Sequence, residues 1–506
     1  MADNADAASR PGMPNRGLAS GVEPVQMERE ALRSTKIRWN VLAVYGSGAL
    51  VENITTTVNL TLLLFYLTII CGLSGAQAGL IVGLTLLIDA VADPIVGSLS
   101  DNCRSRLGRR HPFMLASIIP TAIAFGLLFS VPTGLSGAPL FAYALVALLA
   151  TRVGISFFTV PYTALGAELS DDYAERSNIV AWRMAFNVVG GLGAVILIWG
   201  LFLGGEQGRY QPSAYPRLAW TMAVILAISG FVSTLGTLKE RRRLHCALPA
   251  GNFGAAAFVA EVSEVFRNPS FRSLFISCLI LFISQGATTA LTLHANTFFW
   301  RLTAQQILSV SVFLPVGICV GLVVAGFMKR HFEKRTMTVA GLGLIGLGQL
   351  VPVLLRIANI IGPDLAVAVL AASILANGVG ACLATIGYYS MMADAADEHE
   401  RIFGARREGL YFAGLTLSAK ASLGLGAWIA GVAVDAIGLP HGIAAAPDQV
   451  AKIPAQVIDR LGLIYGPGAA LFTALSIAVL MTYKLSKARH SRILAELRIS
   501  RATLGK

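Results

Sequence analysis

The stretch that decides the fold runs from Asp89 to Pro112 and reads DAVADPIVGSLSDNCRSRLGRRHP. Its apolar first part contains two carboxylates, Asp89 and Asp93, and its second part contains four arginines. The i, i+4 spacing places both acids on one face of a helix, one turn apart. An ionised carboxylate in the hydrocarbon of a membrane costs at least about 2.5–3.5 kcal/mol. We therefore expect the pair to bind a cation or a proton.

The composition around this stretch is that of a membrane protein. The chain has 506 residues, of which 55% are hydrophobic and only 13% are charged, against about 25% charged in soluble domains. The net charge of +12 comes largely from basic residues in short loops, which indicates membrane topology and excludes nucleic acid as a partner. The six cysteines are scattered, with no metal or disulfide spacing. No cofactor is expected.

Long apolar runs predict an all-α polytopic protein with an even number of membrane helices. Twelve spans can be drawn: 41–70, 76–100, 113–131, 138–168, 179–204, 217–238, 271–296, 305–328, 337–356, 364–392, 408–436 and 463–484. The loops after even-numbered spans are basic, so the positive-inside rule places both termini in the cytoplasm and the protein in the plasma or inner membrane.

The longest inner connection divides the chain into two halves of six spans. We expect a disordered tail at 1–38, an N-terminal bundle at 39–238 and a C-terminal bundle at 271–484. The linker at 239–270 has the pattern of an amphipathic helix, and residues 485–506 form a basic tail. Similar basic loops after spans two and eight favour two related halves, as in transporters built from repeats.

Further polar residues inside the spans are candidates for a binding site. Asn53, Thr159, Tyr162 and Thr163 could offer polar groups to a solute, although a threonine can instead bond its own helix. The cations Arg183 and Lys420 each need a carboxylate or an anionic ligand in lipid. Asp89 could likewise be half of a structural ion pair.

His294 and Asp435 lie near the outer ends of their spans, where an interfacial position is expected. At the inner ends, charged residues of the two halves could form an ionic latch that breaks when a cavity opens inward, or they could be plain solvated loops. The latch residues are Asp101, Arg104, Arg109, Arg110, Asp394, Asp397 and Arg407.

Three segments carry a family resemblance. They are DPIVGSLSDNCRSRLGRRHPF (93–113), TVPYTALGAELSDDYAERSNIVAWR (159–183) and MMADAADEHERIFGARREGLYFAGLTLSAKASLG (391–424). Together they resemble the glycoside–pentoside–hexuronide:cation symporters, the melibiose-permease-like branch of the major facilitator superfamily. The resemblance implies two six-helix bundles around a central cavity that opens alternately to each side.

The same resemblance implies roles for single residues. Asp89 and Asp93 match the acids that bind the coupling cation, and they would be the metal ligands if that cation is Na⁺. Lys420 matches a lysine near the cation site, and Arg183 an arginine linked to substrate binding. Ala92 stands where sodium-using members offer an asparagine oxygen, and one fewer oxygen ligand favours H⁺.

The substrate side departs from the melibiose-type pattern. Asn53 and Thr159 replace the two acids that grip galactosides there, and Thr163 replaces a tryptophan that stacks on the sugar. The sequence predicts a symporter, not an enzyme, that couples H⁺ or Na⁺ to uptake of a small solute, with a sugar, glycoside or sugar acid as the leading class. The alternative is a Na⁺-dependent lysophospholipid symporter of the same branch. Membrane lipids are the other expected partners, and the charge placement argues against a channel.

Overall fold

The computed structural model describes residues 37–170, 172–205, 208–243, 263–404, 407–443 and 452–504, and these residues contain twelve helical segments long and apolar enough to span a membrane. This confirms the predicted twelve spans and the all-α class. Residues 1–36 of the tail predicted at 1–38 and most of the predicted linker helix lie outside the described residues. Within the linker, residues 263–267 are helical and lead directly into the next membrane helix.

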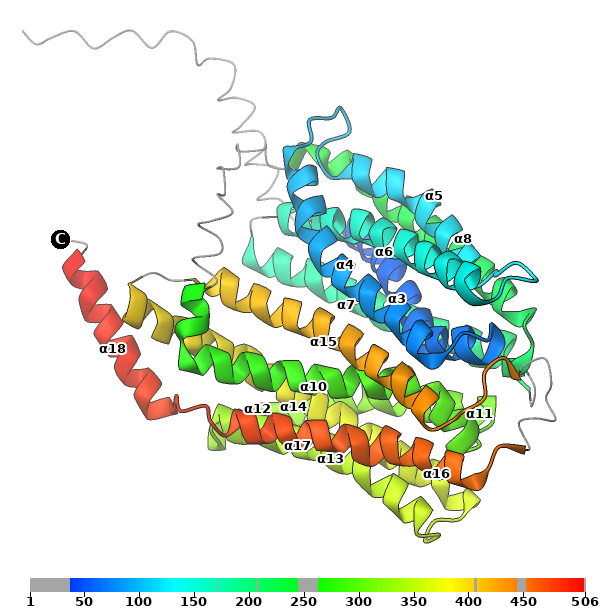
Figure 1. Ribbon diagram of the computed structural model, residues 1–506. Helices are drawn as coiled ribbons and strands as arrows, with labels where there is room; N and C mark the ends of the chain where they lie inside the picture. Colours follow the sequence, from blue (N-terminus) through cyan, green and yellow to red (C-terminus); the bar gives the residue numbers. More distant parts are fainter. Residues whose placement is uncertain are drawn as a thin grey trace, which may run out of the picture.

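The helices form two groups, one above the other in Figure 1. The N-terminal half consists of α2 (Trp39–Ser47), α3 (Ala49–Phe65), α4 (Gly75–Asn102), α5 (His111–Leu128), α6 (Gly137–Glu168), α7 (Tyr173–Ile196) and α8 (Ala214–Thr237). A π-helical turn, Tyr66–Ile70, continues α3, so α2, α3 and this turn together make the first span.

The C-terminal half follows the same plan of six spans. It consists of α10 (Pro269–His294), α11 (Ala304–Ser311), α12 (Phe313–His331), α13 (Lys334–Ile357), α14 (Pro363–Phe403), α15 (Glu408–Ala436), α16 (Ala455–Leu463) and α17 (Ala469–Leu480). Polar side chains cap the N-termini of several helices in both halves. In the N-terminal half, Ser74 and Gln77 form a reciprocal capping box that fixes where α4 begins.

The end of the molecule that carries the basic loops and the C-terminal helix is called the basic end below, and the other is called the opposite end. The two halves meet along α4 and α15, which converge toward the opposite end in Figure 1. Glycines at 75, 79 and 83 of α4 face small residues of α15. A Cβ at Gly79 would lie 2.8 Å from the carbonyl oxygen of Ala427. Small residues at this spacing let two membrane helices pack closely, so the halves are sealed here.

Polar contacts between the halves lie at the same end. His294, which is fully buried, lies 3.0 Å from the hydroxyl of Thr68. Arg209 donates to Thr297 at 3.0 Å. Asp435 accepts from the first backbone N–H groups of α4. The ring of His294 is thus buried between the halves near the end of its span, and its expected position at the membrane interface stays a prediction.

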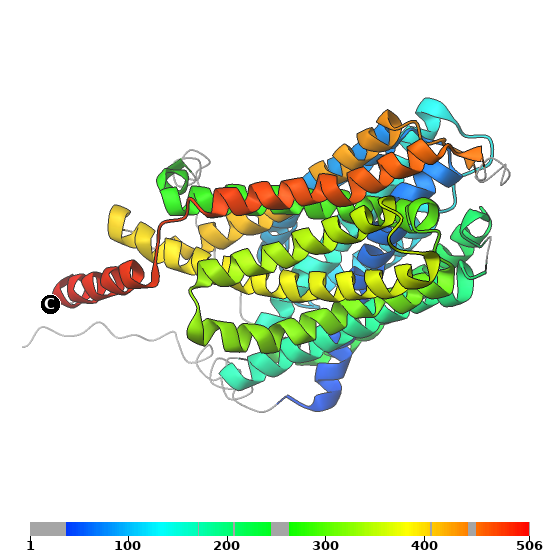
Figure 2. The ribbon, with the colours of Figure 1, turned by 90° about the horizontal axis from the view of Figure 1, so that it is seen from below.

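The helix α14, which ends at the basic end, is longer than a membrane span requires. The 41 residues of α14 make a helix of about 60 Å, against a hydrocarbon thickness of about 30 Å. Residues 487–504 form one more helix, α18 (Lys487–Leu504), which extends from this end in Figure 2. It packs on α14, where Arg489 donates to Glu398 at 2.9 Å. The predicted basic tail is thus mostly a docked helix.

Candidate functional site

The acid pair lies at the interface of the two halves, where Lys420 of α15 approaches it from the other half. The Nζ atom of Lys420 is 3.5 Å from Oδ2 of Asp89 and also hydrogen-bonds Oδ2 of Asp93. Both acids are on one face of α4, as their spacing predicts. One ammonium group therefore pairs with two carboxylates within the membrane span. It can leave them only when another cation or a proton compensates their negative charge.

A second helix of the N-terminal half completes the surroundings of Asp89. Ser156 of α6 donates to Oδ1 of Asp89 at 3.0 Å, and Nη1 of Arg152, one turn earlier, lies 3.8 Å from Oδ2. Sequence reasoning gave neither residue a role. The signal was present, because residues 152, 156 and 159 recur at i, i+4 and i+7 and so share one helix face.

These charged groups line a cavity of about 240 Å³ between the halves. Its walls are formed by residues of α3, α4, α6, α10 and α15: Glu52, Thr56, Asn59, Leu60, Leu64, Val82, Leu86, Asp89, Asp93, Arg152, Ile155, Ser156, Thr159, Val160, Gly286, Thr289, Ala290, Lys420, Leu423 and Ala427. Several wall residues carry unused polar atoms. Both amide atoms of Asn59 and the hydroxyl of Thr159 are buried without a hydrogen-bond partner among the described residues.

The exposure of the acidic side chains in the wall rises toward the basic end. On α4 the side chain of Asp89 is 11% exposed, whereas that of Asp93, one turn nearer the basic end, is 31% exposed. On α3 the order is the same, from buried Asn59 to exposed Glu52. The cavity is therefore closed at the opposite end by the sealed helix pair and accessible from the basic end.

The predicted substrate residues are only partly brought to this cavity. Thr159 lines it. Asn53 faces α7, where its amide donates to Asn187 at 3.4 Å and accepts from Thr57 of its own helix at 3.2 Å. Arg183 lies near the mouth, close enough to interact with the charge of Glu52 and with Tyr45.

Tyr162 and Thr163 lie elsewhere, and the expectation that they present hydroxyls to the cavity is not met in this structure. Tyr162 is 2% exposed, stacks on Tyr45 with ring centroids 4.6 Å apart, and donates to the carbonyl of Tyr45 at 3.0 Å. Thr163 donates to the carbonyl of Val160 within α6 at 3.0 Å. Both hydroxyls are used inside the N-terminal half.

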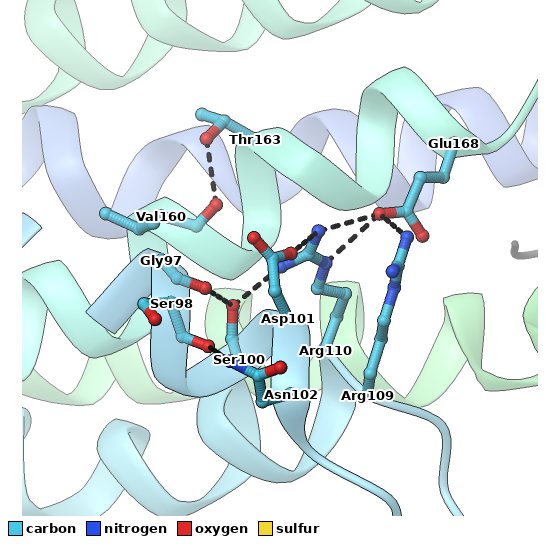
Figure 3. A network of polar contacts seen from close by, with 10 residues as sticks. All are labelled: Gly97, Ser98, Ser100, Asp101, Asn102, Arg109, Arg110, Val160, Thr163 and Glu168. Atoms are coloured by element: carbon cyan, nitrogen blue, oxygen red, sulfur yellow. Dashed lines mark hydrogen bonds and ion pairs between the residues drawn. The ribbon is translucent and has the colours of Figure 1, made fainter. Parts of the chain in front are cut away.

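Figure 3 shows the charged network at the basic end of the N-terminal half. Arg110 is buried and pairs with Glu168 at 2.9 Å and with Asp101 at 2.5 Å, while Arg109 pairs with Glu168 at 2.7 Å. Arg104, another predicted latch residue, is exposed on the loop. Glu168, at the end of α6, is the centre of this network, a role that its place in the sequence did not indicate.

Two latch residues of the C-terminal half, Asp394 and Asp397, also have partners within their own half. Asp394 of α14 is bound by Lys334 of α13 at 2.8 Å, and Asp397 lies 3.0 Å from the ring of His490 on α18. Arg407 directly precedes α15. The ion pairs of Asp394 and Asp397, and those in Figure 3, each lie within one half, and a latch between the halves remains a prediction for another conformation.

Two helical halves that enclose a charged cavity open at one end define a secondary transporter of the major facilitator type. The family described as MFS/sugar transport protein matches residues 44–487, and the chain belongs to this family. It is thus an integral membrane transporter and not an enzyme, and the resemblance found in the sequence is confirmed.

Among curated relatives, an uncharacterized symporter of Synechocystis is 24% identical over 92% of this chain and 98% of its own. The isoprimeverose transporter of Lactiplantibacillus pentosus is 23% identical over 93% of both chains, and a glucuronide carrier protein homolog of Escherichia coli is 24% identical over 77% of this chain and 82% of its own. Among solved structures, a D-xylose-proton symporter shares the fold with a TM-score of 0.56 at 14% identity, covering 88% of this chain and 97% of its own.

Proposed function

We propose that the protein is a cation-coupled symporter that moves a sugar, glycoside or sugar acid across the membrane by alternating access. The observation that carries the proposal is the Lys420 bridge to Asp89 and Asp93. These three groups sit where the two halves meet, so the charge state of the pair acts on the contact between the halves. A bound cation would replace the ammonium and loosen that contact.

The coupling ion is H⁺ or Na⁺, and the ligand set favours H⁺. Asp89 and Asp93 are two carboxylates one turn apart that could bind a hard cation, and Ser156 could add a hydroxyl oxygen. Ala92 offers no side-chain oxygen. Na⁺ prefers several oxygen ligands, whereas a carboxylate pair can hold a proton without further ligands.

The size and polarity of the cavity support a small solute rich in hydroxyl groups. Its volume of about 240 Å³ is below the roughly 300–1,000 Å³ of drug-sized pockets. The unused atoms of Asn59 and Thr159 suit hydroxyl groups. The names of the relatives, which include an isoprimeverose transporter and a glucuronide carrier homolog, point to the same class.

We further propose that the basic end is cytoplasmic and that the charged residues in Figure 3 exchange their partners for residues of the C-terminal half when the cavity opens to the outside. The positive-inside rule supports this orientation.

The proposal is tested with purified protein in liposomes under an imposed H⁺ or Na⁺ gradient. Sugars, glycosides, sugar acids and lysophospholipids are presented one at a time, and each gradient is abolished in turn with an ionophore. We expect one of the first three classes to accumulate against its concentration gradient, and the ionophore to abolish this. Accumulation of lysophospholipid alone, or uptake that never exceeds equilibrium, would overturn the proposal.

A further inference from the structure

Arg152 is a buried cation at the centre of the transport cavity whose hydrogen-bonding groups are poorly used. It lies halfway along α6, lines the cavity and has a side chain that is 10% exposed. Its one described ion pair, to Asp89, is 3.8 Å long, which is beyond hydrogen-bonding distance. Its Nε atom is buried without a hydrogen-bond partner in the described part of the chain.

Arg110 provides an internal comparison, because it is a similarly buried arginine of the same half. Its Nε and Nη2 donate to Glu168 at 3.1 and 2.9 Å, and its Nη1 donates to Ser100 at 2.6 Å. A guanidinium has five N–H donors, and burying it without partners is costly. Three nitrogens of Arg110 donate hydrogen bonds, whereas none is described for Arg152, which indicates that Arg152 has a partner that is bound only during part of the transport cycle.

That partner should be an anion that arrives with the coupling cation. Asp89 is shared by Arg152, Lys420 and Ser156. Once a cation occupies the acid pair, the charge of Asp89 is compensated and its hold on Arg152 weakens. The guanidinium is then free to bind a carboxylate in the two-bond geometry that arginine favours.

The surroundings suit a solute with both a carboxylate and hydroxyl groups. Thr159, two turns along the same face of α6, and Asn59, on α3, offer their unused atoms to hydroxyls of the same molecule. The other cation of the cavity wall, Lys420, is occupied by the acid pair. The remaining carboxylate, Glu52, is exposed toward the basic end, where Lys420 and Arg183 act on it.

We infer that Arg152 is the specificity-determining residue of the cavity and selects a sugar acid over its neutral counterpart. This rests on the proposed function and narrows its substrate class. A cation and a monoanionic sugar acid that enter together add no net charge to the cavity.

Matched pairs of solutes test the inference, since glucuronate and galacturonate differ from glucose and galactose only at one carbon. Binding to the purified full-length protein is measured by calorimetry, and uptake into liposomes is measured by competition. From the strength of a charge-assisted bond, we expect the wild type to favour one acid by roughly 10–100-fold, and Arg152→Gln to lose that preference. Binding of the neutral sugar should change by less than about threefold. Arg152→Lys should keep part of the preference.

The control for loss of one positive charge is Arg217→Gln, an exposed arginine of α8 that bonds Ser213; it should keep the preference. If Arg152→Gln does not fold, Asp89→Asn serves instead, because it releases Arg152 and should strengthen binding of the acid. No preference in the wild type, an unchanged preference in Arg152→Gln, or weaker acid binding in Asp89→Asn would overturn the inference. If the protein binds neutral sugars and sugar acids equally well, only this inference is contradicted. If it binds neither neutral sugars nor sugar acids, the proposed function is contradicted as well.

Discussion

The carboxylate of Asp435 caps the helix that carries Asp89 and Asp93, although it belongs to the other half of the molecule. Its Oδ1 accepts from the backbone N–H of Gly75 at 2.6 Å, and its Oδ2 accepts from the next N–H at 2.7 Å. The N-terminus of a helix leaves such N–H groups free and carries positive partial charge, so a carboxylate there is doubly favourable. The cap therefore ties α4 to α15 at the closed end of the cavity.

Asp435→Ala should shift the protein toward a conformation that is open at the opposite end. Loss of a capping side chain costs about 1–2 kcal/mol, or about 5–30-fold in population. The shift can be measured as a longer distance between spin labels at Thr133→Cys and Ala358→Cys, two exposed positions on opposite-end loops of different halves. Asp435→Asn keeps one acceptor oxygen but turns an N–H donor toward the second backbone N–H group, so it should lengthen the distance as well. Identical distance distributions for all three proteins would contradict this account of the cap.

The glycine seam between α4 and α15 makes a separate prediction. A Cβ at Gly79 lies 2.8 Å from the carbonyl oxygen of Ala427, so Gly79→Val forces the helices apart. The same pair of labels should report a longer distance. Gly193→Val is the matched control, because a Cβ at Gly193 meets nothing within 4 Å. If Gly79→Val leaves the distance unchanged, the seam does not hold this end closed.

Glu168→Gln should strongly destabilise the N-terminal half. The carboxylate forms ion pairs with Arg109 and Arg110, and removing one partner of a buried charge pair costs up to about 3–5 kcal/mol. The exposed pair of Arg401 and Glu496, 2.8 Å long, is the control, and Glu496→Gln should cost no more than about 1 kcal/mol. Denaturant unfolding in detergent compares the two variants. Equal stability losses would show that burial of the network in Figure 3 adds nothing.

Ile493→Asp should detach α18 from α14, because Ile493 is fully buried in their contact and burial of such a side chain is worth about 1.5–3 kcal/mol. Backbone hydrogen exchange in residues 487–504 should accelerate. Ala495→Asp adds the same charge on the exposed side of the helix and should leave exchange slow. Equal exchange in both variants would mean that the docking depends on the ion pairs alone.

The charged part of the site could be predicted because a charge in a membrane span is expensive and so stands out. Asp89, Asp93 and Lys420 were identified in this way, and the structure places them together. The position of Tyr162 could not be predicted, since a hydroxyl on a long apolar helix can face the bundle or the cavity at similar cost. The rotation of α6 decides this, and nearly uniform hydrophobicity leaves that rotation open.

The fold was predictable to the level of the twelve spans, because span length is a property of single segments. Contacts between segments that are far apart in sequence could not be predicted in this way. Asp435 and Gly75 are 360 residues apart, and neither residue alone indicates the cap. Arg152 is an intermediate case. The sequence shows a charge that is costly within a membrane span, but its pairing with Asp89 depends on the packing of α6 against α4.

The central claim is that the Asp89–Asp93 pair couples a cation to solute movement, and Asp93→Asn tests it most directly. In liposomes, with the solute identified as above, we compare accumulation driven by a cation gradient with exchange of labelled for unlabelled solute at equilibrium. The account predicts that Asp93→Asn loses accumulation and keeps exchange, because the cavity remains while one coupling carboxylate is gone. Accumulation equal to that of the wild type would contradict it.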